Sequence, residues 1–349
     1  MTATAGTALL GCGRIAALFH LPILAGLEGS ILRAVAEPDP GRRAAAGARA
    51  GTVTVVDDYR TVLADVDVDA VVVCLPSGLH AEAACAAFEA GKHVYLEKPI
   101  ATTLPDARWV QAAWRSAGTV GMIGFNQRFD PVVTALRRAV EEGQLGTVTG
   151  ARIMLGAATR TPPAWKQHRV TGGGVLLDLG SHAADLTRFV FGQEVRSVTA
   201  TVMSHRFEHD TAALTMVLWD GRLVQAHLTS TAAQESRCEL LGERGRLVAD
   251  RYAGTLELQP PLPPYSAVAR ARRGLRSLRR LPSHAIALVA PPHDAHPYRA
   301  ALHAFIGAVR GERPCSPDLD DGYRSLAVVA AAEEAALRGR SVEVEVAAR

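Results

Sequence analysis

The sequence lacks a marked excess of charge of either sign, and it lacks long hydrophobic runs. Its 349 residues include 38 basic and 35 acidic side chains, which gives a formal net charge of +3. No global positive field therefore favours a nucleic-acid partner. The apolar run at residues 70–75 is far shorter than the roughly 20 residues that a membrane-spanning helix needs. We expect a protein that binds neither nucleic acid nor a membrane.

Cysteines are few, and their spacing is irregular. Zinc sites and small disulfide frameworks place their ligands or half-cystines at recognisable short intervals. The chain also begins without a basic leader, and its first apolar run ends in a glycine turn instead of a small-residue cleavage site. We therefore expect reduced thiols, no metal site and a cytoplasmic location. The five cysteines are Cys12, Cys74, Cys85, Cys238 and Cys315.

The length suits two domains, each with its own core. Residues 1–124 alternate short apolar strand patterns with helical patterns, which is typical of a βαβ arrangement and a parallel sheet. Residues 125–349 hold strand patterns with little helix between them, and two helical stretches follow. The sequence thus predicts an α/β protein whose second domain contains an open, largely antiparallel sheet.

The expected elements of the first domain are strands at 7–11, 32–37, 53–55, 71–75 and 93–96, and helices at 15–27, 41–50, 59–63 and 80–90. Those of the second domain are strands at 148–155, 195–203, 212–219, 223–229 and 238–241, and helices at 296–310 and 322–338.

A glycine-rich turn stands where the first strand should meet the first helix. It reads Gly11-Cys12-Gly13-Arg14-Ile15-Ala16, and two glycines in this place let a backbone approach a pyrophosphate at a helix N-terminus. Such glycine pairs also occur by chance, but the strand before and the helix after support the functional interpretation. We expect Gly11, Gly13, Arg14 and Ile15 to contact a dinucleotide.

An acid ends the next expected strand. Glu37 falls where a carboxylate binds the ribose hydroxyls of a dinucleotide, and its charge would repel a 2′-phosphate. We therefore predict NAD as the cofactor. NADP is the alternative, because Arg42 and Arg43 follow closely and could bind that phosphate.

Two further segments carry candidate catalytic groups. Glu97-Lys98-Pro99 follows an expected parallel strand, whose carboxyl end faces the ligand crevice of such folds. Asp178 and His182 lie four residues apart, so on a helix they would share one face. No third and fourth ligand stands at a suitable spacing for metal binding.

Together these segments resemble the Gfo/Idh/MocA oxidoreductase family. Two more of its motifs occur in the expected order, Pro76-Ser77-Gly78-Leu79-His80 and Asn126-Gln127-Arg128-Phe129. The resemblance implies a Rossmann domain at residues 1–124. It also implies an α/β domain at residues 125–349 that shapes the substrate pocket and often the oligomer interface, here of a homodimer or homotetramer. Ala16 in place of a third glycine, and Ser77-Gly78 where many members carry asparagine, are small departures.

The resemblance also implies residue roles. Lys98, Asp178 and His182 look like the catalytic group, which also binds the substrate. Pro76, His80 and Glu97 look like cofactor-binding residues near the nicotinamide, as does Lys98. Asn126 and Arg128 look like substrate-binding residues.

The predicted reaction is hydride transfer between nicotinamide and a secondary alcohol or ketone carbon of a sugar-like substrate. Oxidation of the alcohol needs a base within hydrogen-bond reach of the hydroxyl. His182 fits that role, since the unperturbed pKa of histidine is about 6.5, and Lys98 could then stabilise the developing oxyanion. The reverse assignment, with Lys98 as the proton-transfer group, fits the sequence equally well.

The loop before the triple glycine 172–174 offers a further substrate residue. Trp165 could stack on a sugar face, and its basic neighbours would favour a neutral or anionic substrate over a strongly cationic one. The alternative is that Trp165 only packs against its own domain. The abundance of alanine and arginine is typical of high-GC bacteria, in which such enzymes often act on cyclitols or on sugars of secondary metabolites, aminoglycosides among them.

Two other functions share this fold: a regulator that binds NAD and a sugar without turnover, and an NAD-assisted glycoside hydrolase. The regulator would be expected to have lost the reaction site, whereas lysine, aspartate and histidine are all present here. A basic segment at residues 270–280 holds six arginines and leucines spaced for one helical face. We expect it to lie outside the chemistry.

Overall fold

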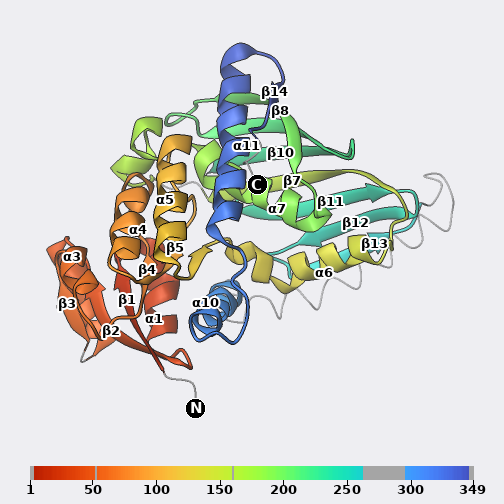
Figure 1. Cartoon of the computed structure of the whole chain (residues 1–349). Coiled ribbons are helices and arrows are strands. Elements are labelled where there is room, and N and C mark those ends of the chain that lie inside the picture. Colours follow the sequence, from red (N-terminus) through yellow and green to blue (C-terminus); the bar gives the residue numbers. More distant parts are fainter. Residues whose placement is uncertain (1–3, 52, 159–160, 262–294, 346–349) are drawn as a thin grey trace.

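The computed structural model describes residues 4–51, 53–158, 161–261 and 295–345. Two sheets dominate them, one of six strands and one of eight (Figure 1). The basic segment at 270–280 lies outside the described residues. No described helix is both long and apolar enough to span a membrane.

The first sheet is entirely parallel, with strand order β3-β2-β1-β4-β5-β6. Its central strands are buried on both faces, and all four residues of β4 are 0% exposed, which explains their unbroken apolar runs. The order reverses between β1 and β4, where open α/β sheets bind ligands. The strands are β1 (Ala5–Leu10), β2 (Ser30–Ala36), β3 (Thr54–Val56), β4 (Ala70–Val73), β5 (His93–Leu96) and β6 (Gly121–Ile123).

Helices connect these strands and cover the sheet. Asp39 and Thr103 cap α2 and α5 by accepting hydrogen bonds from backbone N–H groups of the first turn. The single helix expected at 15–27 is instead a π-helical turn, η1 (Ala16–His20), followed by α1 (Leu21–Leu24). The remaining helices are α2 (Pro40–Ala50), α3 (Tyr59–Leu63), α4 (His80–Glu89) and α5 (Leu104–Ala117).

The second sheet has the order β13-β12-β11-β7-β10-β9-β8-β14. Every neighbouring pair is antiparallel except β7 with β10, so the largely antiparallel sheet is confirmed. Three strands were not predicted: β12 and β13 form a hairpin at one edge, and β14 at the other edge has only two residues. The strands are β7 (Val148–Ala158), β8 (Val195–Met203), β9 (Thr211–Leu218), β10 (Leu223–Ala232), β11 (Glu235–Gly242), β12 (Gly245–Asp250), β13 (Thr255–Gln259) and β14 (Val342–Glu343).

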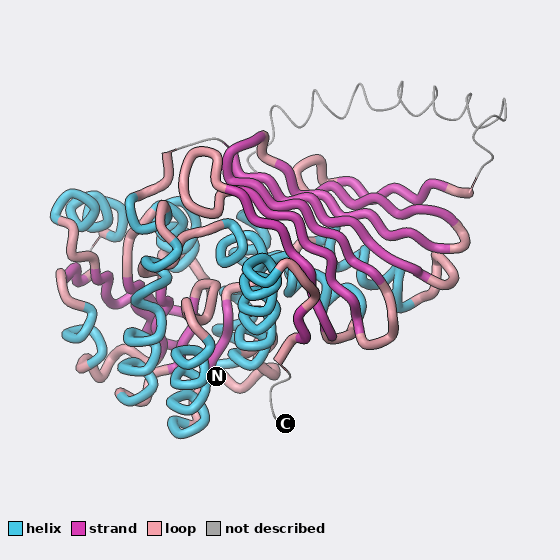
Figure 2. The backbone as a smooth tube through the Cα atoms, turned by 90° about the horizontal axis from the view of Figure 1, so that it is seen from above, coloured by secondary structure: helices cyan, strands magenta, loops and turns pink. Residues whose placement is uncertain are grey.

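Three helices pack on one face of this sheet and leave its other face uncovered by any described helix (Figure 2). They are α6 (Pro131–Glu141), α7 (Ser181–Phe191) and α11 (Leu319–Arg338). A fourth helix, α10 (Ala295–Val309), returns to the first sheet, where Leu302 and Phe305 join a core cluster with Tyr95. The boundary at residues 124 and 125 stays a prediction, and α10 is the element that crosses it.

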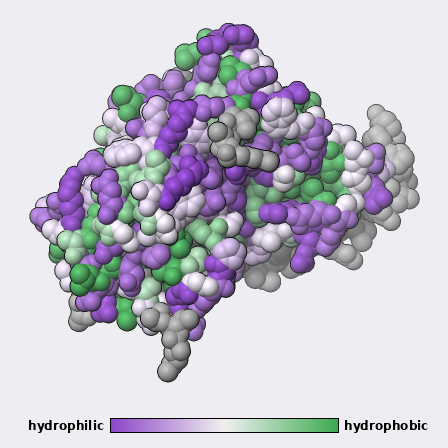
Figure 3. Space-filling view, viewed as in Figure 1, coloured by the Kyte–Doolittle hydropathy of each residue, from purple (hydrophilic) through white to green (hydrophobic). Residues whose placement is uncertain are grey.

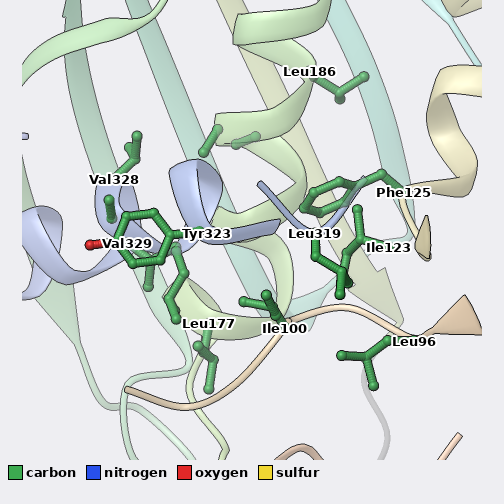
Figure 4. Packing of buried hydrophobic residues seen from close by; sticks show 14 of the residues in the cluster. Leu96, Ile100, Ile123, Phe125, Leu177, Leu186, Leu319, Tyr323, Val328 and Val329 are labelled. Carbon is green, nitrogen blue, oxygen red and sulfur yellow. The ribbon is translucent and has the colours of Figure 1, made fainter. Parts of the chain in front are cut away.

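A continuous hydrophobic core joins the two sheets (Figure 4). Leu96 and Ile123 from the first sheet belong to the same buried cluster as Leu319 and Tyr323 of α11 and Leu177, which precedes Asp178. All five are at most 2% exposed. The residues that flank the predicted site are therefore anchored in well-packed interior, which limits their movement.

A buried ion-pair network fixes α7 against its surroundings. Arg128 Nη2 lies 2.6 Å from Asp185 Oδ1 on α7, and Arg128 Nη1 lies 3.0 Å from Asp321 Oδ2 on α11. Arg188 on α7 binds the other oxygen of Asp321 at 2.9 Å and also Glu194. Because Arg128 and Asp185 are only 10% and 1% exposed, loss of one partner would leave a buried charge uncompensated.

We predict that Arg128→Met lowers the free energy of unfolding by about 3 kcal/mol, the lower range for breaking a buried pair. Arg338→Met is the matched control, because Arg338 pairs with Glu334 on the surface, and we expect a change of less than about 0.5 kcal/mol. Chemical denaturation followed by circular dichroism would measure both. Equal stability of the two variants would show that the buried network adds nothing.

Candidate active site

Several of the predicted site residues lie at the carboxyl ends of three adjacent parallel strands. Gly11 follows β1, Pro76 follows β4 and Lys98 follows β5, and these strands neighbour one another in the order β1-β4-β5. The reversal of strand order lies between the first two. The site therefore occupies the crevice that this type of sheet offers to ligands.

The glycine turn fits a dinucleotide. Gly11 has a φ of 90°, and a Cβ there would meet the backbone oxygen of Cys74 at 2.8 Å, whereas a Cβ on Gly13 would have nothing within 4 Å. The first glycine thus allows the tight turn, and the second leaves open space where a pyrophosphate can approach the backbone. Arg14 and Ile15 are exposed beside this space.

Glu37 is only 3% exposed and is held from both sides. Its Oε2 accepts from the N–H of Cys12 at 2.7 Å, and its Oε1 accepts from the N–H of Asp39 and from Arg42 Nη2 at 2.9 Å. Burial raises the pKa of Glu37, but these donors outweigh it and lower the pKa overall. The carboxylate is therefore ionised beside the glycine turn, with Arg42 as its exposed partner. Arg43 instead donates to the backbone oxygens of Glu37 and Pro38.

His80 lies beneath the site. The ring is 1% exposed, with Nδ1 2.7 Å from the backbone oxygen of Pro99 and Nε2 2.9 Å from that of Leu75. Burial lowers the pKa of His80. It joins the turn after β4, which contains Pro76, to the turn after β5, which contains Lys98, so its contacts position these turns.

A second buried histidine was not predicted. His20, the last residue of η1, is 0% exposed, and its Nε2 lies 2.7 Å from Glu97 Oε1. The other Glu97 oxygen accepts the N–H of Lys98 at 3.2 Å. The Glu97 side chain is thus fixed beside Lys98. Nothing in the sequence marks His20 as a site residue, because it lies 77 residues before Glu97 and only the fold brings the two side chains together.

Lys98 and Asp178 meet across the two domains. Lys98 Nζ donates to Asp178 Oδ1 at 2.7 Å and to its backbone oxygen at 2.8 Å. The second carboxylate oxygen accepts from Lys166 Nζ at 2.9 Å. Burial raises the pKa of Asp178, but the charges of Lys166 and Lys98 outweigh it and hold the pKa well below its usual range.

Asp178 lies in a π-helical turn, η6 (Leu176–Gly180), directly before α7. Such turns inside helices are frequent at functional sites. His182 is in the first turn of α7 and is 9% exposed. Burial, followed by the charge of Lys98, lowers the pKa of His182 well below 6.5, although Asp178 acts in the opposite sense. His182 is therefore neutral at neutral pH, as a general base must be.

The predicted substrate residues differ in their surroundings. Asn126, 7% exposed, lies in the short 3₁₀ turn η3 (Asn126–Phe129) after β6. Trp165 is half-buried in a second such turn, η4 (Ala164–Lys166), and the Lys166 ammonium lies 5.4 Å from its ring centre. Arg128 differs from both, because Asp185 and Asp321 engage its guanidinium. These contacts make Arg128 an anchor for α7, and the substrate-binding role expected of it stays a prediction.

Comparison with known protein families matches both parts of the chain. Residues 5–125 match the oxidoreductase family with an NAD-binding Rossmann fold, and residues 133–248 match the GFO/IDH/MocA C-terminal domain. These matches confirm the family, the fold class, the oxidoreductase class and the NAD cofactor predicted from the sequence.

Similar proteins span nearly the whole chain. Inositol 2-dehydrogenase 2 of Saccharopolyspora erythraea is 30% identical, over 99% of this chain and 96% of the relative. The 1,5-anhydro-D-fructose reductase of Ensifer adhaerens is 30% identical, over 97% and 98%. The crystal structure of GenD2 from gentamicin A biosynthesis in complex with NAD superposes with a TM-score of 0.82 at 25% identity, covering 99% of this chain and 98% of that one. The chain therefore belongs to the GFO/IDH/MocA family of NAD-binding oxidoreductases.

Proposed function

We propose that this enzyme transfers a hydride between the nicotinamide of NAD and a secondary alcohol or ketone carbon of a sugar or cyclitol. The observation that carries the proposal is the contact between Lys98, at the end of a Rossmann strand, and Asp178 of the second domain. It places a cation and an ionised carboxylate at the crevice, one turn of helix before the neutral, buried His182. That set can handle one hydroxyl proton and the charge that develops on its oxygen.

The relatives support the substrate class. The names of two of them concern inositol and an anhydro sugar, and that of a structural neighbour concerns gentamicin A biosynthesis. A cyclitol, a free sugar or a sugar unit of a secondary metabolite such as an aminoglycoside would each present a secondary alcohol. Trp165 lies on the loop that borders Asp178 and offers an apolar face to such a ring.

The glycine turn at Gly11 and Gly13 and the carboxylate of Glu37 would hold NAD, which would supply the hydride acceptor. The protein residues handle the proton and position the oxygen. Lys98 Nζ donates to two oxygens of Asp178. The third hydrogen atom of the ammonium group is left for the substrate oxygen, whose developing negative charge the cation stabilises. His182 then takes the hydroxyl proton as the base, and Asp178 orients both Lys98 and the substrate hydroxyl. In the reverse direction His182 returns the proton to the new alkoxide.

The surroundings of His182 favour this assignment over Lys98 as the proton-transfer group. His182 needs no prior deprotonation, because its pKa is depressed by burial and by Lys98. For alcohol oxidation, kcat/KM should therefore be independent of His182 protonation above about pH 6.5, its unperturbed pKa, and should fall only at lower pH, as the ring gains a proton.

We predict that Lys98→Met and His182→Asn each reduce turnover by at least about 10²-fold, the lower range for loss of a proton-transfer or oxyanion group. The double variant should be little worse than either single one if the two groups act as a unit. A screen of inositols, hexoses, aminosugars and nucleotide sugars for NADH production would provide the substrate.

Arg338→Met, on the outer surface of α11, is the activity control. NAD binding by all variants, measured by fluorescence, should stay near that of the wild type. Near-normal turnover of Lys98→Met would remove the mechanism. A cofactor that copurifies without net NADH production would favour a glycoside hydrolase, and sugar binding without any turnover would favour a regulator.

The geometry of Glu37 supports a preference for NAD over NADP. Ribose hydroxyls can donate to its carboxylate in place of Arg42, whereas a 2′-phosphate would face the same negative charge. We predict that wild-type enzyme binds NAD more tightly than NADP. Glu37→Ser should narrow the difference by about tenfold, because it removes that repulsion and releases Arg42 for the phosphate. Fluorescence titration with both cofactors decides this, and tighter binding of NADP by the wild type would contradict it.

The open face of the second sheet supports a homo-oligomer. It carries a hollow of about 510 Å³ lined by residues of β7, β8, β9 and β10 and, at the C-terminal end of α11, by Ala335, Gly339 and Arg340. Figure 3 shows the opposite side of the molecule, where α11 and α6 lie in front of the sheet and hydrophilic and hydrophobic residues are interspersed. We propose that two copies pack through this sheet face to give a homodimer, or a homotetramer if a second contact is added.

Ala213→Arg tests the interface, because Ala213 is exposed in the middle of this face, between Thr201 and His227. We expect the variant to shift the mass measured by light scattering toward the monomer, since an arginine there blocks flat packing of two sheets. Ala64→Arg, at the exposed end of α3, should leave the mass unchanged. A wild-type monomer, or an unaltered oligomer in Ala213→Arg, would contradict the proposal.

A further inference from the structure

Lysine is rare in this chain. The sequence has three lysines and 35 arginines, so nearly every positive side chain is arginine. Lys92 is buried and donates to two backbone oxygens, those of Asp65 and Val68, at 2.8 Å. The other two lysines, Lys98 and Lys166, both contact Asp178. In a chain that uses arginine almost everywhere, two lysines on one carboxylate indicate a site that needs ammonium groups.

Each ammonium group binds a different oxygen of the Asp178 carboxylate. Lys98 lies 2.7 Å from Oδ1 and Lys166 lies 2.9 Å from Oδ2. Arginine would present a planar fork that tends to bind both oxygens of one carboxylate, whereas lysine is a compact charge that can share them. Lys98, Lys166 and Asp178 together carry one surplus positive charge.

The loop that carries Lys166 is fixed against both domains. A Cβ on Gly173 would meet the backbone oxygen of Lys166 at 2.3 Å, so the triple glycine permits this close approach. Arg169 binds the carboxylate of Glu333 on α11, and its Nη2 donates to the backbone oxygen of Thr102 at 3.0 Å. Thr102 lies four residues after Lys98. The loop around Lys166 is thus fixed by the close approach of Gly173 and by the contacts of Arg169 with α11 and Thr102.

We propose that Lys166 is a second active-site lysine, which fixes Asp178 together with Lys98 and disfavours substrates with an ammonium group next to the reacting carbon. The inference deepens the proposed dehydrogenase function and rests on it for the substrate. Lys166 acts on Asp178 as a positioning residue, and its charge repels a cationic neighbour of the reacting hydroxyl. Neutral cyclitols and sugars meet no such repulsion.

Four charged groups influence the imidazole of His182, each from a different element. Lys98 follows β5, Asp178 lies in η6, Arg251 follows β12 and Lys166 lies in η4. Arg251 also forms an ion pair with Asp130, at 2.9 Å. Lys98, Arg251 and Lys166 disfavour the protonated ring, and Asp178 favours it. Loss of the Lys166 charge should therefore let His182 take up a proton at higher pH.

The first test needs no substrate. The enzyme, saturated with NADH and labelled with ¹³C-histidine, would be titrated by NMR, with the His182 signal assigned through its loss in His182→Asn. We expect Lys166→Gln, which keeps a hydrogen-bond donor but loses the charge, to raise the pKa of His182 by about half a pH unit or more. Lys166→Arg should keep it near the wild-type value. His168→Gln is the matched control, since His168 is in the same loop and 67% exposed.

An unchanged His182 titration in folded Lys166→Gln would overturn the positioning role. An equal rise in His168→Gln would overturn it too, because loop disturbance alone would then explain the effect. The substrate screen tests the specificity role at pH 7. We expect the best neutral substrate to exceed its amino counterpart in kcat/KM, and Lys166→Gln to reduce that ratio at least about fivefold.

An amino sugar as the preferred substrate of the wild type, or an unchanged ratio in Lys166→Gln, would overturn the specificity role. If the screen finds no substrate at all, the proposed dehydrogenase function fails. The NMR titration still decides whether Lys166 acts on the Asp178 and His182 pair, so the two failures are distinguishable.

Discussion

The contact between Lys98 and Asp178 is the interaction on which the rest of the site depends. It joins the carboxyl end of a Rossmann strand to a π-helical turn of the second domain, 80 residues later in the chain. An ammonium and a carboxylate taken out of bulk water need each other and further hydrogen bonds to offset their desolvation. Here the backbone oxygen of Asp178 and the ammonium of Lys166 supply them.

The surrounding fold serves to hold that contact at the crevice. The ring of His80 contacts backbone oxygens of both the turn after β4 and the turn after β5, which contains Lys98. His20 of η1 contacts the carboxylate of Glu97. Behind His182, α7 is locked by the pair between Arg128 and Asp185. The chemical consequence is a set of opposite ionisation states in adjacent groups: Asp178 stays charged and His182 stays neutral. Such separation of pKa values within one site is how general bases and charge-stabilising groups are assigned different tasks.

Sequence patterns predicted the elements whose burial leaves a clear signature. The parallel strands of the first sheet are buried on both faces and therefore form unbroken apolar runs, so five of the six were expected near their observed positions. The edge strand β13 and the two-residue β14 lack such a signal, because edge strands are half exposed. Asp178 and His182 were expected on one regular helix, whereas Asp178 lies in a π-helical turn that leads directly into the helix of His182.

Other features of the site depend on contacts between segments that are distant in the sequence, so local patterns could not predict them. The partners of Arg128 lie 57 and 193 residues away, and no local pattern shows that its charge is used by α7 and α11. The sequence shows Lys166 only as a basic neighbour of Trp165, and its contact with Asp178 depends on the fold.

The most direct test of the proposed site is a crystal structure with NADH and the best alcohol from the screen. The reacting oxygen should lie within about 3.2 Å of both Lys98 Nζ and a ring nitrogen of His182, and an oxygen outside hydrogen-bond reach of both groups would contradict the account.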